Sequence, residues 1–332
     1  MHFPSRSPSA RTREKALSQG AESGRFTALH SSRAPMIRRN SIRPRGRRGV
    51  ATVSALVYLC LLVEPPTLSA QDWPCWLGPA RSGMVTGFNA PAHWPDSLTQ
   101  RWRQRIGLGE STPALADERL YVFAREENEE VILALNARDG APLWRYSYPA
   151  VAVTGPAEPY PGPRSSPAVA GGKVVALGVG GVLTCLDAAS GERVWRRDDF
   201  TNHLPRFFTS ASPLVEGGLC IIQVGGPANG RVLALALDTG RSRWAWEGEG
   251  PSYASAVLLT LACSKQVVLL TENSLVGLDF HTGQLLWRIP TPLKPGYWNS
   301  ASPLVEVQTV YYSVGDPPFY AFPLLSGNHI FV

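Results

Sequence analysis

The chain has 332 residues, of which 44% are hydrophobic and 17% charged, with 31 glycines and 29 prolines. This composition is typical of an all-β globular body that is rich in turns. The formal net charge of +6 is uneven, because residues 1–70 hold twelve Lys or Arg against three Glu. Residues 71–332 carry 20 basic and 23 acidic side chains, which argues against a nucleic-acid-binding surface.

The first 70 residues have the pattern of an export signal. Residues 1–35 are rich in Ser, Arg and Ala without periodicity, so we expect them to be disordered or to precede the true start at Met36. In residues 36–70, six arginines precede the apolar run 50–63, and a small-residue site ends at Ala70. The run is shorter than the roughly 20 residues of a membrane span. We therefore predict a cleaved signal peptide and export to the periplasm or cell envelope, with a retained N-terminal anchor as the alternative.

Tryptophan recurs at a nearly fixed period in the rest of the chain. The intervals are 42, 51, 49 and 43 residues between Trp102, Trp144, Trp195, Trp244 and Trp287. A glycine stands four residues before each of the last four, at Gly140, Gly191, Gly240 and Gly283. Asn136, Asp187 and Asp279 stand four residues earlier again, with Ala236 as the exception. A period near 45 residues indicates a repeat architecture.

Each repeat is predicted to contain two hairpins. The segment that ends at each tryptophan is predicted to be a strand, a turn and a strand. Asp or Asn can bond backbone amides two residues further on, and glycine readily adopts the left-handed conformation that such a turn needs. A second hairpin follows segments such as SSPAVAGGKVVALG from Ser165 and ASPLVEGGLCIIQV from Ala211. Two hairpins give a four-stranded antiparallel blade, and the tryptophan is expected to fill the space between neighbouring blades.

These repeated hairpin segments resemble the repeat of the PQQ-like, quinoprotein-type β-propeller family, an architecture related to WD40 and YVTN-like repeats. The resemblance covers about 72–315, and DWPCWLGPARSGMVTG at 72–87 resembles the opening of exported bacterial BamB-like proteins. It implies a β-propeller with 71–97 as an N-terminal segment and blades over 98–315. It implies function only weakly, because the same blade serves enzymes and scaffolds.

The repeats supply four complete blades, a leading strand over 98–106 and a partial fifth blade from Asn299. Residues 316–332 depart from the repeat pattern and form an atypical C-terminal tail. We therefore expect either a small ring or an incomplete one, and favour an incomplete ring from a shortened chain.

No catalytic or metal-binding set is recognised in the sequence. The four histidines of the body lack metal-ligand spacing, and no two cysteines are adjacent, as the disulfide of quinone dehydrogenases would require. Buried thiols are favoured over disulfides. The residues ahead of each inner strand are expected to face a central channel and form the candidate ligand- or partner-binding set: Glu110, Arg164, Thr209, Tyr253 and Asn299. An Arg and an Asn there could hold an anionic ligand, although capping of strand ends is the favoured interpretation.

Two connecting segments have the composition of contact loops. Residues 145–164 are long, Pro-rich and aromatic, and 196–208 combine arginines with two phenylalanines. The leading hypothesis is an exported, non-catalytic β-propeller scaffold that binds a protein or an envelope component, without a cofactor. One alternative is a PQQ-dependent dehydrogenase, or its degenerate remnant, with PQQ and calcium. Another is a ligand-binding sensor ectodomain, in which a retained anchor would be the membrane contact.

Overall fold

A computed structural model describes residues 71–314, apart from 228, 262, 292 and 294, together with strand segments 324–326 and 329–331. The chain divides into units of residues 1–67 and 68–332, and the described residues all lie in the second unit. The predicted disordered start and signal peptide lie outside the described residues. Among the described residues no helix has the length and apolar character needed to cross a membrane.

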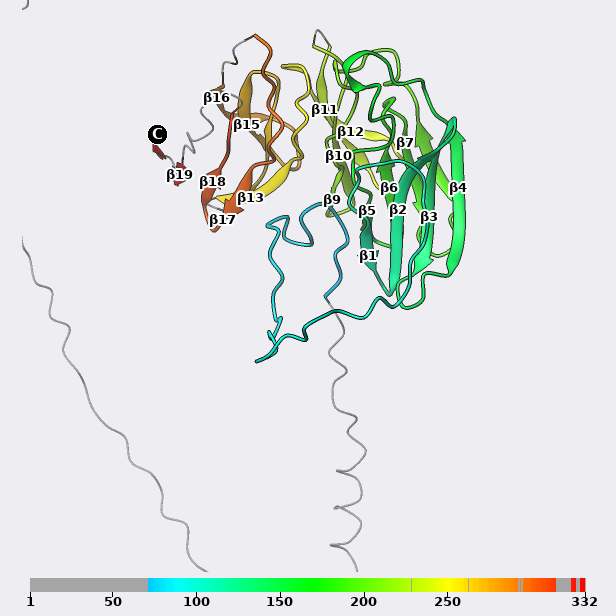
Figure 1. Cartoon of the computed structure of the whole chain (residues 1–332). Coiled ribbons are helices and arrows are strands. Elements are labelled where there is room, and N and C mark those ends of the chain that lie inside the picture. Colours follow the sequence, from blue (N-terminus) through cyan, green and yellow to red (C-terminus); the bar gives the residue numbers. More distant parts are fainter. Residues whose placement is uncertain are drawn as a thin grey trace, which may run out of the picture. The chain divides into compact units, whose positions relative to one another are not determined.

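The described residues form five four-stranded antiparallel sheets, which confirms the predicted all-β propeller fold (Figure 1). The first sheet comprises β1 (Ala114–Ala116), β2 (Arg119–Glu126), β3 (Glu129–Asn136) and β4 (Pro142–Pro149). The second comprises β5 (Ala168–Ala170), β6 (Lys173–Leu177), β7 (Leu183–Asp187) and β8 (Arg193–Arg197). The third comprises β9 (Leu214–Glu216), β10 (Leu219–Val224), β11 (Arg231–Ala236) and β12 (Ser242–Trp246). A turn of 3-10 helix, η2 (Gly155–Ala157), lies between the first two sheets.

The last two sheets follow the same order. The fourth comprises β13 (Val257–Leu261), β14 (Ser264–Leu270), β15 (Ser274–Asp279) and β16 (Leu285–Pro290). The fifth comprises β17 (Leu304–Glu306), β18 (Thr309–Tyr311), β19 (Leu324–Ser326) and β20 (His329–Phe331). The fifth sheet therefore has four strands where the sequence predicts a partial blade. The predicted leading strand is wrong, because no strand forms over 98–106.

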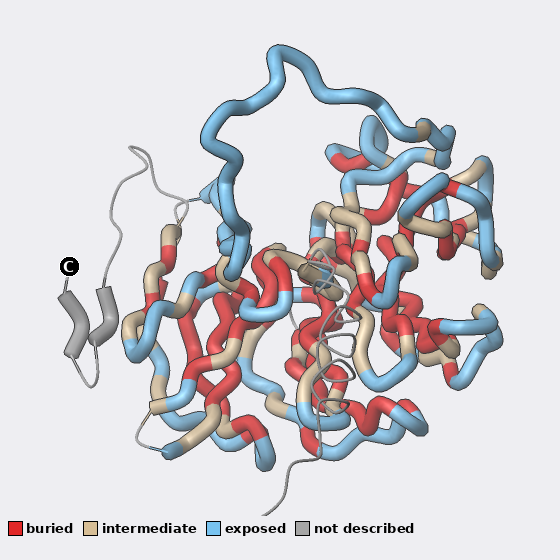
Figure 2. The backbone as a smooth tube through the Cα atoms, turned by 90° about the horizontal axis from the view of Figure 1, so that it is seen from below, coloured by how far each residue is buried: buried red, intermediate tan, exposed pale blue. Residues whose placement is uncertain are grey.

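The core lies in layers between consecutive sheets. Buried side chains form one cluster between each neighbouring pair of sheets, from the first to the fifth. The first strands β1, β5 and β9 lie next to one another, and β13 lies next to β17, so the short first strands are the inner ones. Figure 2 shows the buried residues concentrated in the strands, whereas a long connecting segment is exposed. Residues 83–101 are exposed throughout.

Four of the five repeated tryptophans lie against the turn of the next sheet, whereas Trp287 lies against Gly277 and donates its indole N–H to Gln266 Oε1 within its own sheet. A Cβ atom built on Gly140, Gly191 or Gly240 would stand 2.6–2.7 Å from the indole of the preceding repeat's tryptophan, and Gly283 faces Trp244 in the same way. These four glycines have φ between 66° and 74°. Trp102, Trp144, Trp195 and Trp244 each donate their indole N–H to a carbonyl of that next turn, at 2.6–3.0 Å. Consecutive sheets from the first to the fourth are thus joined by a repeated contact between an indole ring and a glycine.

The turns themselves are built by the predicted carboxylates. Asp187 Oδ1 accepts hydrogen bonds from the amides of Ala189 at 3.0 Å and Ser190 at 2.9 Å. Asp279 Oδ1 accepts equivalent bonds from His281 and Thr282. The amide and hydroxyl of Ser190 lower the pKa of Asp187, and the Thr282 hydroxyl, followed by the amides, lowers the pKa of Asp279. A side-chain acceptor of this kind provides hydrogen bonds to amides that have no backbone partner in a tight turn.

A relay of serine hydroxyls connects the inner ends of all five sheets. In each case the donor is the amide of the residue just before the inner-strand proline, or before Ala256 in the fourth sheet, and the acceptor is the serine of the next sheet. The four bonds measure 2.8–2.9 Å and run Thr112 to Ser166, Ser166 to Ser212, Ser212 to Ser255 and Ser255 to Ser302. Buried amides need such partners, so the relay satisfies the backbone where neighbouring sheets meet.

The N-terminal segment 73–81 touches all five sheets. The backbone of Trp73 pairs with Leu115 of β1, and Pro74 accepts a bond from Val169 of β5. The buried Arg81 guanidinium donates to the carbonyls of Pro213 and Ala256, which precede β9 and β13. Trp76 Nε1 donates to Ser302 Oγ at 3.3 Å, ahead of β17. The segment therefore ties the inner strands together.

Candidate functional site

Three of the five predicted site residues line one cavity. Glu110, Arg164 and Tyr253 precede inner strands of the first, second and fourth sheets, and they border a cavity of about 420 Å³. Tyr160, Phe207 and Trp298 are among its other lining residues. The two predicted contact segments, 145–164 and 196–208, thus meet at this cavity. The sequence indicates each segment separately, but their meeting depends on how the sheets stack.

Thr209 and Asn299 do not line this cavity. Thr209 is buried, and its hydroxyl donates to the carbonyls of Gly178 and Val179 in the second sheet. Asn299 is buried too, and its Nδ2 donates to Thr271 O at 2.9 Å and Thr291 Oγ1 at 3.0 Å. Both side chains therefore hold loops together.

Arg164 is held by backbone carbonyls of both contact segments. Its Nη1 donates to Phe207 O and its Nη2 donates to Tyr160 O at 2.9 Å. Burial lowers the pKa of Arg164, while the nearby Glu110 carboxylate acts in the opposite direction. An arginine keeps its charge under such a shift. Because its donors already serve carbonyls, Arg164 fixes the shape of the cavity rim more than it offers an anion site.

Three aromatic rings, Phe207, Tyr253 and Trp298, form what we call the aromatic cluster. The Phe207 ring lies edge-on to Trp298 at 4.8 Å and to Tyr253 at 5.7 Å between centroids. The Tyr253 hydroxyl accepts a bond from the Phe207 amide at 3.1 Å. The guanidinium of Arg206 lies 5.6 Å from the Trp298 ring centroid and 5.9 Å from that of Phe207. The cluster is a rigid apolar surface with an exposed cation beside it.

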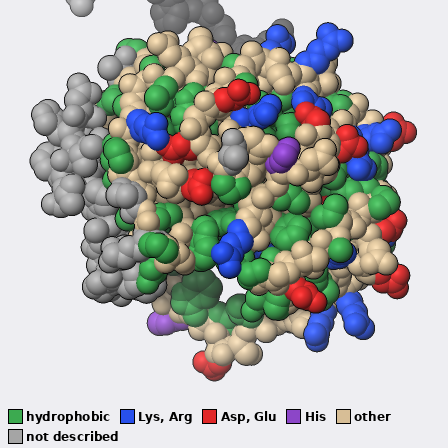
Figure 3. All heavy atoms as spheres, turned by 90° about the horizontal axis from the view of Figure 1, so that it is seen from above, with side chains coloured by type: hydrophobic (Ala, Val, Ile, Leu, Met, Phe, Trp, Pro, Cys, Tyr) green, Lys and Arg blue, Asp and Glu red, His purple; other side chains and the backbone are tan. Residues whose placement is uncertain are grey.

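The rest of the surface carries both signs of charge. Figure 3 shows acidic and basic side chains scattered over the face seen from above, with hydrophobic side chains around a hollow. That distribution lacks the single-sign stripe of a nucleic-acid interface on this face.

The cysteines are free among the described residues. Cys185 and Cys220 are buried, as predicted, and burial raises the pKa of Cys185 to about 12. Cys75 is half-buried, and its Sγ donates to Gly78 O at 3.1 Å. Cys263 is exposed.

The residues at the cavity fit a bound quinone with calcium poorly. An anionic cofactor requires free donors, whereas both terminal nitrogens of Arg164, the predicted site arginine at this cavity, donate to loop carbonyls. Among the described residues no three His, Cys, Asp or Glu side chains gather as metal ligands. We therefore derive no reaction step through a quinone.

Comparison with known proteins identifies the repeat. The family described as outer membrane protein assembly factor BamB matches residues 85–160 and 128–330. Quinohemoprotein alcohol dehydrogenase ADH-IIG of Pseudomonas putida is 28% identical over 149 residues, which are 43% of this chain and 20% of that protein. The corresponding enzyme of Comamonas testosteroni is 29% identical over 140 residues, 41% of this chain and 19% of its own length. The chain thus matches about a fifth of the length of these curated relatives.

Solved structures share the fold. The crystal structure of the Comamonas testosteroni enzyme superposes with a TM-score of 0.57 at 19% identity, covering 77% of this chain and 47% of that one. A europium-containing methanol dehydrogenase gives a TM-score of 0.54 at 16% identity, covering 74% and 55%. At these identities the structures support the propeller fold alone. The repeats, the indole contacts and the match across most of the body show that the chain belongs to the PQQ-repeat family described as outer membrane protein assembly factor BamB.

Proposed function

We propose that this chain is an exported, non-catalytic β-propeller scaffold that binds another protein or an envelope component through the cavity rim. The observation that carries the proposal is that the cavity rim exposes an aromatic side chain and an arginine. Arg164 is engaged by carbonyls, while Tyr160 is 58% exposed and Arg206 is exposed beside the aromatic cluster. Exposed aromatic rings and arginines are typical of the residues that dominate protein interfaces.

The family description supports a role in assembly, because it names an outer membrane assembly factor. The arginine-rich start and apolar run support export. N-terminal sequencing of the protein from envelope fractions tests that part, and we expect a mature chain starting after Ala70. A chain that keeps residues 36–70 would instead support a retained anchor.

A PQQ-dependent dehydrogenase, or its remnant, is the second candidate. It is favoured by one observation, that both curated relatives are quinohemoprotein alcohol dehydrogenases. Against it stand the engaged donors at the cavity, the lack of adjacent cysteines and the small share of those enzymes that is matched.

Site-specific photocrosslinking tests the scaffold proposal. A benzophenone amino acid replaces Tyr160 at the rim or, as a control, Leu143, which is 46% exposed on the outer strand β4. We expect one discrete envelope adduct from position 160 and none from position 143. Arg206→Glu should reduce the adduct, whereas Arg193→Glu on exposed β8 should leave it unchanged. Equal adducts at both positions, or none at 160, would count against the proposal.

A further inference from the structure

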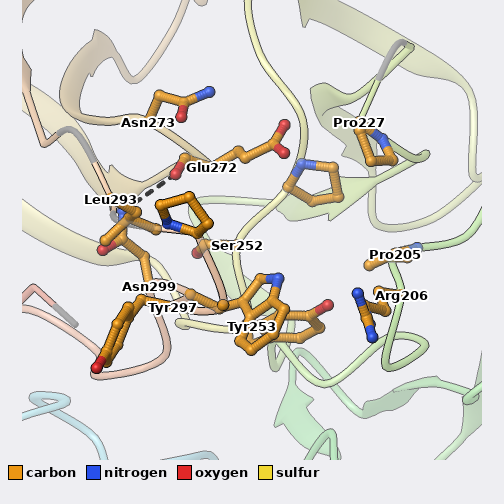
Figure 4. A pocket seen from close by; sticks show the side chains of 14 residues that line it. Pro205, Arg206, Pro227, Ser252, Tyr253, Glu272, Asn273, Leu293, Tyr297 and Asn299 are labelled. Atoms are coloured by element: carbon orange, nitrogen blue, oxygen red, sulfur yellow. Dashed lines mark hydrogen bonds between the residues drawn. The ribbon is translucent and has the colours of Figure 1, made fainter. Parts of the chain in front are cut away.

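A second cavity, of about 210 Å³, lies beside the first, between loops of the third, fourth and fifth sheets (Figure 4). It shares Tyr253 and Trp298 with the first cavity, but its other walls come from different loops. Four prolines supply much of its apolar wall: Pro205, Pro227, Pro251 and Pro295. Its volume is below the roughly 300 Å³ at which pockets begin to enclose drug-sized ligands, so a smaller molecule fits.

One wall of this cavity is held by hydrogen bonds among the loops of the fourth and fifth sheets. The Asn299 side chain donates from Nδ2 to Thr271 O and Thr291 Oγ1. Its backbone carbonyl accepts a hydrogen bond from the Tyr253 amide at 3.0 Å. Prolines restrict the backbone of the facing loops further. A ligand would therefore meet a preformed cavity and would have little ordering cost to overcome.

The cavity presents opposite charges from separate loops. Figure 4 shows Glu272 and Arg206 reaching toward it from different parts of the chain. Glu272 packs over Gly250, where an added Cβ would stand 2.5 Å from the carboxylate Oε2. The Glu272 amide also donates to Gly250 O at 2.9 Å. Arg206 lies over the Trp298 ring, which sets the position of its guanidinium.

We propose that this cavity binds a small apolar zwitterion, an α-amino acid or a dipeptide. Its ammonium group would pair with the Glu272 carboxylate and its carboxylate with the Arg206 guanidinium, through charge-assisted hydrogen bonds. Its side chain would contact the prolines and aromatic rings. A ligand with a single charge would leave one of the two protein charges unpaired. This site goes beyond the scaffold function proposed above and does not depend on it.

Isothermal titration calorimetry of the full chain tests the proposal with four related probes. L-leucine carries both charges, N-acetyl-L-leucine lacks the ammonium, L-leucinamide lacks the carboxylate, and L-leucyl-L-leucine separates the two. We expect saturable binding of L-leucine and affinities at least roughly tenfold lower for the two single-charge probes. Binding of the dipeptide at higher affinity than leucine would identify peptides as the source of the zwitterion.

Two substitutions separate the charges. Glu272→Gln should weaken the binding of L-leucine but leave the binding of N-acetyl-L-leucine unchanged. Arg206→Gln should weaken the binding of L-leucine but leave the binding of L-leucinamide unchanged. Glu247→Gln and Arg193→Gln, both at exposed positions, serve as matched controls with unchanged affinity. Circular dichroism verifies that each variant folds. Absence of saturable binding by leucine and dipeptide, equal binding of all probes, or binding of D-glucose instead would overturn the proposal.

Discussion

Gly240 lies so close to the indole of Trp195 that a Cβ atom at position 240 would stand 2.7 Å from the ring. The Trp195 N–H also donates to Leu237 O, in the same turn, at 2.6 Å. One tryptophan thereby joins the second sheet to the third by packing and by a hydrogen bond. The same contact recurs between the first and second sheets and between the third and fourth.

Gly240→Ala should therefore destabilise the protein by about 2–4 kcal/mol, combining left-handed strain with steric overlap against the indole. Gly172→Ala is the matched control, since Gly172 has φ 69° and no atom within 4 Å of an added Cβ. It should cost only about 1–2 kcal/mol of strain. Urea unfolding followed by fluorescence measures both. Equal losses would mean that the indole does not confine position 240.

Trp195→Ala should cost about 3–5 kcal/mol, because a large buried ring is removed from between two sheets. Trp195→Phe should cost less, about 1–3 kcal/mol, since much of the ring remains while Leu237 O loses its donor. Trp94 is 63% exposed, so Trp94→Ala should change the free energy of unfolding by under about 0.5 kcal/mol. A loss below about 1 kcal/mol for Trp195→Ala would contradict the burial of its indole.

The serine relay offers a test with adjacent residues. Ser166→Ala leaves the half-buried Thr112 amide without its acceptor and should cost about 1–3 kcal/mol. The neighbouring Ser165 is equally buried, but its Oγ has no hydrogen-bond partner within the described part of the chain. Ser165→Ala should therefore be neutral or slightly stabilising. Chemical denaturation of the two variants distinguishes the relay from a general cost of losing a buried hydroxyl.

Glu130 predicts a pH dependence of stability at the junction of the first two sheets. Its carboxylate accepts bonds from the Val179 amide at 2.8 Å and the Tyr148 hydroxyl at 2.7 Å, yet desolvation dominates and raises the pKa of Glu130. A folded-state pKa above the unfolded value favours folding in acid. The stabilising contribution is complete below the ordinary pKa of glutamate and is lost as pH rises through the raised pKa.

Glu130→Gln removes this titration. Relative to the parent, the variant should gain stability as pH increases from about 4 toward neutrality. Thermal unfolding at a series of pH values gives the difference. A constant offset between parent and variant across that range would show that the pKa of Glu130 is not raised.

The blades were predictable from sequence because their signals are local. Gly191 and Asp187 specify a turn through backbone conformation and side-chain bonding, and Trp195 follows at a fixed offset. The strand expected over 98–106 fails for a physical reason. Trp102 makes the same contact with the next turn as its counterparts, but the segment has no described strand beside it to complete a ladder.

The candidate site was predictable only in part. Of the five residues ahead of inner strands, Glu110, Arg164 and Tyr253 line one cavity, since equivalent blade positions lie near one another. The sequence could not indicate which side chains already have partners. Arg164 bonds carbonyls 4 and 43 residues away, and such pairs follow from stacking and loop shape. The sequence does not indicate the second cavity for the same reason, because Arg206 and Glu272 lie on loops that are far apart along the chain.

An absorbance titration tests the central functional claim most directly. The purified full chain is mixed with pyrroloquinoline quinone and calcium, separated from free quinone, and assayed for alcohol-dependent dye reduction. The scaffold account predicts no stoichiometric quinone absorbance in the protein fraction and no turnover. Saturable quinone binding together with alcohol-dependent dye reduction would contradict it.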